Sequence, residues 1–139
     1  MRRLPLLFSC ACIVLSACRA RDFGGLLLDK PGEFTCFDGQ LLVTVAESPQ
    51  NQLNVTLKRG EDNVNSPKPD LQKASPWAIY TETADLVWIY DGAKEVKLVT
   101  FATNGTSTVT STLQTNGLLK MVPLVLRPRL APELQAQSK

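Results

Sequence analysis

The feature that most constrains the fold is an alternation of apolar and polar residues with a period of two along the middle of the chain. Leu53, Val55 and Leu57, for example, alternate with polar side chains. Successive side chains of a β-strand point to opposite faces, so this pattern predicts strands with one buried face. The strand-like runs are 33–38, 40–47, 51–59, 77–82, 85–91, 94–103, 106–113 and 117–126.

Turn dipeptides separate several of these runs. Both central residues of a type I′ hairpin turn need a positive φ, which favours Asn-Gly and Asp-Gly. Such pairs occur at Asp38-Gly39, Asp91-Gly92, Asn104-Gly105 and Asn116-Gly117. Because a lone sheet would leave one apolar face in water, we expect an all-β fold. It would be a small antiparallel β-sandwich or barrel of about seven or eight strands, largely a meander.

The first residues have the layout of a secretory signal. Arg2 and Arg3 precede an apolar stretch of about a dozen residues that ends near Leu15. A helix that spans a membrane takes about 20 apolar residues, so this stretch is too short for that role. We therefore expect an N-terminal signal segment that is removed on export.

The end of this segment resembles the lipobox of bacterial lipoproteins. It reads Leu15-Ser16-Ala17-Cys18, an apolar residue and two small residues before a cysteine. The resemblance implies cleavage between Ala17 and Cys18 and attachment of acyl chains such as palmitate to Cys18. Two or three acyl chains, at about 0.8 kcal/mol per buried methylene, form a stable membrane anchor. The alternative is an ordinary signal cleaved after Ala17, with no lipid on Cys18.

Arg19, the residue after Cys18, indicates which membrane would hold the anchor. Enteric bacteria place Asp there to retain a lipoprotein in the inner membrane, whereas this chain has Arg19. By that resemblance we expect a protein anchored in the outer membrane of the bacterial envelope and facing the periplasm.

These features divide the chain into four expected parts. Residues 1–17 are a lipoprotein signal peptide, 18–32 a lipidated tether, 33–127 an antiparallel β domain and 128–139 a polar C-terminal tail. We expect one short helical turn around 130–136 in this tail. A polar, proline-containing stretch from Gly60 to Pro76 is either a functional loop or a solvated crossover between two sheets.

The charge balance argues against nucleic acid as a partner. The chain has 15 Lys and Arg and 13 Asp and Glu, and Arg2 and Arg3 are the only charged residues before Cys18. Their removal leaves 13 residues of each sign and a net charge of zero. Binding to nucleic acid depends on an excess of Lys and Arg that neutralises phosphates.

Motifs for catalysis and for metal or cofactor binding are missing from the sequence. The chain has no His, which is the commonest proton-transfer and metal-binding side chain. It also lacks an Asp-rich calcium loop, a Gly-rich phosphate loop and a Gly-x-Ser-x-Gly elbow. We therefore expect a protein that is not an enzyme and that binds no metal and no cofactor.

Cys36 is the second cysteine of the expected mature chain, after Cys18. Phe34 and Phe37 place it in a predicted strand, where a cysteine packs as a small hydrophobic residue. A reactive or intermolecular thiol is the alternative.

Four aromatic side chains near the middle of the chain form the candidate binding surface. They are Trp77, Tyr80, Trp88 and Tyr90. By parity Trp88 and Tyr90 share one face of a strand, and Phe101 on the next strand would lie across from them. Exposed rings would stack on sugars or peptides, whereas buried rings would serve core and cross-strand packing.

Part of the mature chain is similar to the membrane-bound inhibitors of c-type lysozyme, which are small lipid-anchored β-barrels. Phe34-Thr35-Cys36, followed by an alternating apolar run, resembles their aromatic-x-Cys strand entry. The stretch 74–80 lies where that family carries a Ser-Gly-x-x-Tyr inhibitory loop, with Pro76 in place of the glycine. The resemblance implies that Ser75 and Tyr80 would be the inhibitory residues.

Three classes of function follow. The leading hypothesis is a membrane-anchored lipoprotein whose small non-catalytic β domain binds an envelope protein or a glycan. The alternative is a periplasmic inhibitor of a lysozyme-like hydrolase. An enzyme comes third, because the sequence offers no His and no paired nucleophile and base.

Overall fold

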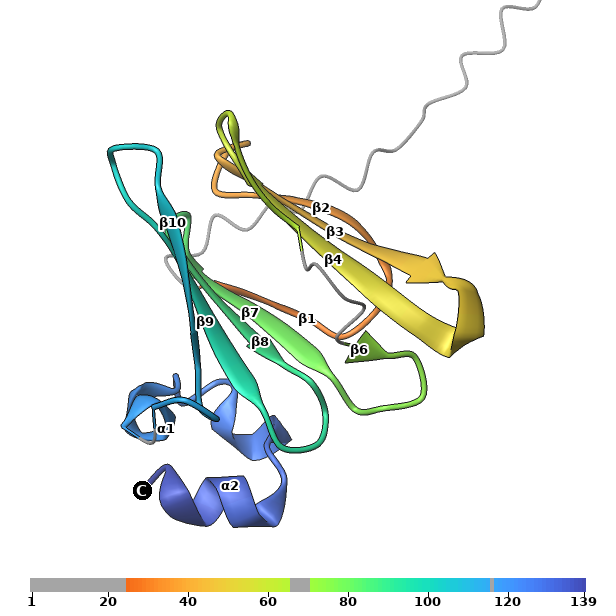
Figure 1. Cartoon of the computed structure of the whole chain (residues 1–139), viewed down its shortest axis with the longest axis vertical. Helices are drawn as coiled ribbons and strands as arrows, with labels where there is room; N and C mark the ends of the chain where they lie inside the picture. Colours follow the sequence, from red (N-terminus) through yellow and green to blue (C-terminus); the bar gives the residue numbers. More distant parts are fainter. Residues whose placement is uncertain (1–24, 66–70, 116) are drawn as a thin grey trace, which may run out of the picture.

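The computed structural model describes residues 25–65, 71–115 and 117–139. Within these residues two antiparallel sheets pack face to face, and a helical segment covers the far side of one of them (Figure 1). The predicted signal peptide, with its cleavage and lipidation residues, lies outside the described residues.

The first sheet, called sheet A, has the spatial order β1-β7-β8-β9-β10. Its strands are β1 (Leu26–Leu28), β7 (Ala78–Thr83), β8 (Leu86–Tyr90), β9 (Val96–Phe101) and β10 (Ser107–Ser111). The last four strands are sequential neighbours, as expected of a meander.

The second sheet, called sheet B, has the order β2-β3-β4-β5, with a short β6 also paired to β4. Its strands are β2 (Gly32–Cys36), β3 (Leu41–Ser48), β4 (Gln52–Arg59), β5 (Asp62–Asn65) and β6 (Leu71–Gln72). The fold class is therefore confirmed: the chain forms a small antiparallel all-β sandwich.

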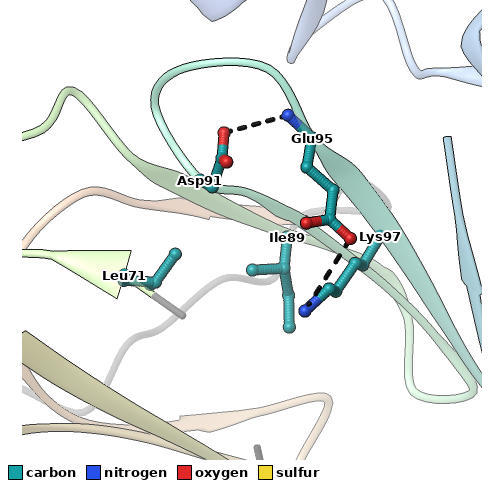
Figure 2. Close-up of a pocket in the computed structure, with 5 residues that line it drawn as sticks. All are labelled: Leu71, Ile89, Asp91, Glu95 and Lys97. Carbon is teal, nitrogen blue, oxygen red and sulfur yellow. Dashed lines mark hydrogen bonds and ion pairs between the residues drawn. The ribbon is translucent and has the colours of Figure 1, made fainter. Parts of the chain in front are cut away.

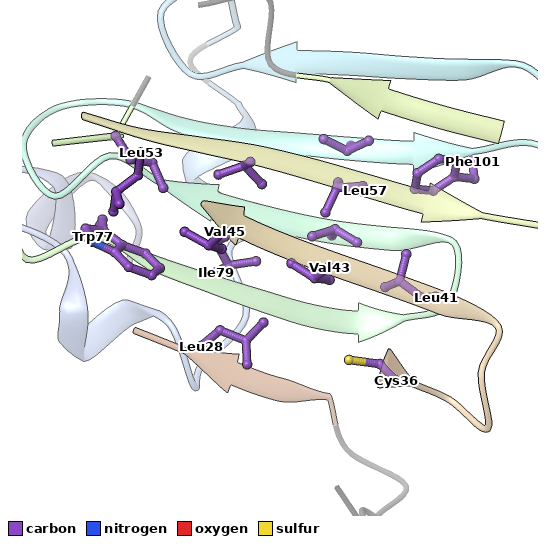
Figure 3. Packing of buried hydrophobic residues seen from close by; sticks show 14 residues of the cluster. Leu28, Cys36, Leu41, Val43, Val45, Leu53, Leu57, Trp77, Ile79 and Phe101 are labelled. Atoms are coloured by element: carbon purple, nitrogen blue, oxygen red, sulfur yellow. The ribbon is translucent and has the colours of Figure 1, made fainter. Parts of the chain in front are cut away.

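The space between the sheets is filled by the side chains that alternate along the strands (Figure 3). In sheet B, Val43 pairs with Leu57 and Val45 with Val55 in register, so all four side chains point to the same face. Sheet A supplies Ile79, Val87, Val99 and Phe101 from the opposite side. Each fully buried side chain of this kind contributes roughly 1.5–3 kcal/mol.

Sheet A has a second buried face. Strand β8 is apolar at every position, and Val87 and Trp88, which point to opposite faces, are 0% and 2% exposed. A strand that is apolar throughout is typical of a sheet covered on both sides. The cover is the C-terminal segment, whose Leu118, Leu119, Val122, Leu126 and Leu130 form a second core with this face of sheet A.

This cover overturns the prediction of a strand over 117–126. The segment instead forms helix α1 (Leu118–Met121), a further turn, a 3-10 helix (Arg127–Arg129) and helix α2 (Pro132–Gln137). A short apolar run fits either a strand or a buried helix. Here the buried residues from Leu119 on, Val122, Leu126 and Leu130, are spaced three to four apart, as on one side of a helix, and Pro123 has no N–H to donate to a sheet.

The expected polar tail over 128–139 also packs on the domain. Leu130 and Ser138 are each 3% exposed. The residue range of helix α2 nearly coincides with the helical turn that was expected around 130–136. The two leucines of this stretch, Leu130 and Leu134, join the second core, so the expected tail lies against the domain.

Two connections contain strands that the sequence pattern did not predict. Leu26–Leu28, inside the expected tether over 18–32, forms β1 against β7. The expected loop from Gly60 to Pro76 contains β5 and β6, both paired to β4. These strands are too short for their alternation to stand out, and pairing to a longer strand stabilises them.

The predicted turns lie in hairpin loops at 38–39, 91–92 and 104–105, between paired strands. Their expected type I′ geometry is wrong at two of them, since Gly92 and Gly105 have positive φ but Asp91 and Asn104 do not. The Asp91 carboxylate instead organises a wider loop by accepting backbone hydrogen bonds. Asn116 lies outside the described residues.

Candidate functional site

The aromatic cluster is buried. Trp77, Tyr80, Trp88 and Tyr90 are 4%, 7%, 2% and 1% exposed. Trp77 lies in the core between the sheets, while the other three lie in the second core beneath the C-terminal segment. The prediction of these four residues as an exposed binding surface is therefore wrong, and the packing alternative holds.

Phe101 does not lie across from Trp88 and Tyr90, as was expected. Trp88 lies opposite Leu98, and Tyr90 lies opposite Val96. Phe101 has the other parity on β9, so its ring points into the core between the sheets. Because the rings are divided between two cores, they cannot form one stacking platform for a ligand.

The polar ends of two buried rings have hydrogen-bond partners inside the protein. The Trp88 indole N–H donates to the Glu82 carboxylate at 2.7 Å. The Tyr90 hydroxyl accepts the backbone N–H of Ala131 at 3.0 Å and lies 3.5 Å from the Ala93 carbonyl oxygen. These contacts satisfy groups that would otherwise be costly to bury.

Tyr90 joins strand β8 to the chain just before α2. Burial raises the pKa of its hydroxyl above the ordinary value of 10.0, and the nearby charges of Asp91 and Glu133 act in the same direction. The hydrogen bond from Ala131 lowers the pKa but does not offset burial. Tyr90 therefore stays neutral at ordinary pH and links strand β8 to the C-terminal segment.

A small hollow lies where the β8–β9 hairpin approaches β6, and Figure 2 shows the five residues that line it. They are Leu71, Ile89, Asp91, Glu95 and Lys97. Its cavity volume of about 10 Å³ is near the minimum that holds one water molecule. The hollow is thus too small for an organic substrate.

The charged groups of this hollow are engaged in the fold. One Asp91 carboxylate oxygen accepts the backbone N–H groups of Ala93, Lys94 and Glu95 at 2.8, 2.9 and 3.1 Å. The Glu95 carboxylate accepts the hydroxyl of Ser111 at 2.7 Å and lies 3.9 Å from the Lys97 ammonium. Their contacts organise a loop and the β9–β10 edge, which is a structural role.

Two other acidic side chains, those of Asp85 and Glu82, also have partners inside the protein. Asp85 forms an ion pair with Arg59 at 2.9 Å across the two sheets, and Glu82 accepts the Trp88 indole. Among the described residues, no three Cys, Asp or Glu side chains gather in a way that would hold a metal ion.

Ser75 and Tyr80 do not share an exposed loop. Tyr80 is in β7 with its ring in the second core, while Ser75 is half-buried in the turn before that strand. The turn packs closely on the neighbouring loop: a Cβ added to Gly92 would come within 2.9 Å of the Ser75 Cβ. The two residues implied by the resemblance to lysozyme inhibitors therefore lie in different surroundings, one in a core and the other in a turn.

Cys36 is 7% exposed and lies in the core between the sheets (Figure 3). This agrees with its interpretation as a small hydrophobic residue.

A surface feature that the sequence pattern did not reveal lies in the C-terminal segment. Met121, Leu124 and Val125 are 65%, 76% and 50% exposed. Since 117–126 was predicted as a strand, alternate residues of this run were expected to be buried. A helical period fitted to the same residues would have placed Met121 and Leu124 on the side opposite the buried residues.

The described part of the chain contains no helix that is both long enough and apolar enough to cross a membrane. Comparisons with protein-family models, with curated proteins and with solved structures found no match to this chain.

Proposed function

We propose that the protein is a lipoprotein of the bacterial envelope, anchored by acyl chains on Cys18, whose small β-sandwich binds an envelope partner without catalysing a reaction. The observation that carries the proposal is the sequence Leu15-Ser16-Ala17-Cys18 at the end of a secretory signal. A short apolar segment, two small residues and a thiol provide what lipidation and cleavage require.

The hollow at the β8–β9 hairpin gives no support for catalysis. The hollow beside Asp91 and Glu95 accommodates about one water molecule, and both carboxylates have structural partners. A catalytic acid or base would need a substrate within hydrogen-bond reach.

A protein partner is favoured over a glycan. Glycan recognition by this chain was expected to use stacking on Trp77, Tyr80, Trp88 and Tyr90, and these rings are buried. The proposed partner is therefore an envelope protein first and a glycan second.

The anchor is tested by growing cells that express the full chain with labelled palmitate. We expect label in the wild-type protein and in a Cys36→Ser control, but none in Cys18→Ser. Label that persists in Cys18→Ser would overturn the proposal.

The partner is tested by cross-linking in intact cells, followed by solubilisation in detergent and identification of the captured proteins. Recovery of structural envelope proteins supports the binding role. Reproducible recovery of a lysozyme-like hydrolase, with loss of its activity, would favour the inhibitor alternative instead.

A further inference from the structure

The C-terminal segment presents a compact group of exposed apolar side chains. We call residues 121–125 the apolar tip. Its Met121, Leu124 and Val125 are at least half exposed although they lie within five consecutive residues. Single exposed hydrophobic residues are common on protein surfaces, whereas a group of them close together is a candidate contact with another surface.

The tip is held in place by its own backbone and by the core. Val122 and Leu126 are 1% and 0% exposed and bury into the second core. The Leu126 N–H donates to the Pro123 carbonyl oxygen at 3.0 Å, which closes a turn. The exposed side chains are therefore presented by an ordered turn and are not the result of fraying.

Arg127 fastens the base of the tip. Its guanidinium donates to the carbonyl oxygens of Val122 at 2.8 Å and Lys120 at 3.1 Å. Carbonyl oxygens carry no formal charge, so the positive charge of Arg127 is fixed beside the tip and is not neutralised.

The sequence on either side of the tip carries basic residues and no acidic residue before Glu133, which lies in helix α2. From residue 96 to residue 132 the chain contains four basic residues and no Asp or Glu. Lys97 and Arg129 lie near the carboxylates of Glu95 and Asp29. Lys120 makes no ion pair with the described residues, and Arg127 bonds to backbone carbonyls. Two cationic groups thus flank the exposed apolar side chains.

The tether keeps this segment near the anchor. Six residues, 19–24, separate Cys18 from Gly25, and extended chain covers at most about 25 Å over that interval. Strand β1 and the residue after it contact the C-terminal segment directly: Leu27 packs on the second core, and Asp29 pairs with Arg129 at 3.0 Å. An anchored chain would hold the tip within reach of the bilayer.

We propose that the apolar tip inserts into the surface of a membrane that contains anionic phospholipids. Met121, Leu124 and Val125 enter the boundary between headgroups and acyl chains, while Lys120 and Arg127 lie at the phosphates. An apolar surface bordered by cations is the chemistry of interfacial membrane contact. This inference rests on the proposed lipid anchor, and it adds a second contact that orients the domain on the membrane.

The test places a polarity-sensitive fluorophore on the tip of the lipidated mature protein. Leu124→Cys is labelled with the fluorophore and reconstituted in vesicles of phosphatidylethanolamine and phosphatidylglycerol that carry nitroxide-labelled lipid. The buried Cys36 is shielded, and the parent chain treated in the same way gives the background. The matched control is Val109→Cys. Val109 is also exposed, at 47%, but it lies opposite Val99 on the side of sheet A that faces sheet B.

We expect the nitroxide to quench the fluorophore at 124 several times more strongly than the fluorophore at 109. The difference should decrease in phosphatidylcholine vesicles and in Lys120→Gln. Equal quenching at 124 and 109 in protein that floats with the vesicles would overturn the tip contact and leave the anchor intact. Protein that does not float would indicate failure of the anchor itself. Shielding of 124 in cell envelopes, but not in pure vesicles, would point to a protein partner and would also overturn the lipid contact.

Discussion

Replacement of Leu126 by Ala tests whether the C-terminal segment is an integral layer of the domain. Leu126 is 0% exposed and belongs to the core that contains Trp88 and Tyr90. The substitution removes three carbon groups, which corresponds to about 2–2.5 kcal/mol of lost transfer free energy. Because Trp88 and Tyr90 are held in a paired strand, the space left behind cannot collapse fully. We therefore expect a total loss of about 3 kcal/mol in the free energy of unfolding.

The matched control is Leu124→Ala, two residues away. Leu124 is 76% exposed, so its truncation should change the free energy of unfolding by less than about 0.5 kcal/mol. Urea unfolding of the mature chain, followed by tryptophan fluorescence, measures both values. A Trp77→Phe background leaves Trp88 as a reporter inside the second core. Equal midpoints for the two variants would refute the packing of this segment on sheet A.

Three further predictions concern single groups. Tyr90→Phe should lower stability by about 1–2 kcal/mol, because it removes the acceptor of the Ala131 N–H. Since burial raises the pKa of Tyr90 above 10.0, the neutral form is favoured by folding, and stability should fall as pH rises past 10.0 in wild type. This loss of stability above pH 10.0 should be absent in Tyr90→Phe. Identical stability profiles against pH for the two proteins would contradict this role of Tyr90. Gly92→Ala should destabilise the protein by about 1–3 kcal/mol more than Gly39→Ala, as judged by thermal unfolding. Both glycines have φ near +85°, but only at Gly92 would a Cβ come within 2.8 Å of backbone. Cys36 should react with a thiol reagent only after the protein is unfolded, as followed by mass spectrometry, and fast labelling of folded protein would show that the thiol is accessible.

Strands with a clear alternation were predictable from sequence. In β4 the residues Leu53, Val55 and Leu57 point into the core, and Asn54 and Lys58 are exposed. This pattern depends only on the two-residue period of a strand and on one face being in water. Strands as short as β1 and β6 carry too few residues for the same signal, so they were missed.

The candidate binding site could be predicted only in part. Parity placed Trp88 and Tyr90 correctly on the same face of one strand. Parity does not say whether that face is exposed, which depends on what covers it. The unbroken apolar run of β8 was a signal that both faces are covered, because a strand with a wet face alternates.

The sequence by itself determined the class of fold and the pattern of inward-facing side chains in the longer strands, because both follow from interactions between near neighbours along the chain. The helical conformation of residues 118–130 became clear only from their position over sheet A. The apolar residues of this run fit a strand and a helix almost equally well, until Leu118, Leu119, Val122, Leu126 and Leu130 meet the outer face of β7, β8 and β9. That long-range contact decided that the segment is helical, that the aromatic rings are buried, and that Met121, Leu124 and Val125 face outward. Tertiary structure alone decided these points because burial depends on residues far apart in sequence.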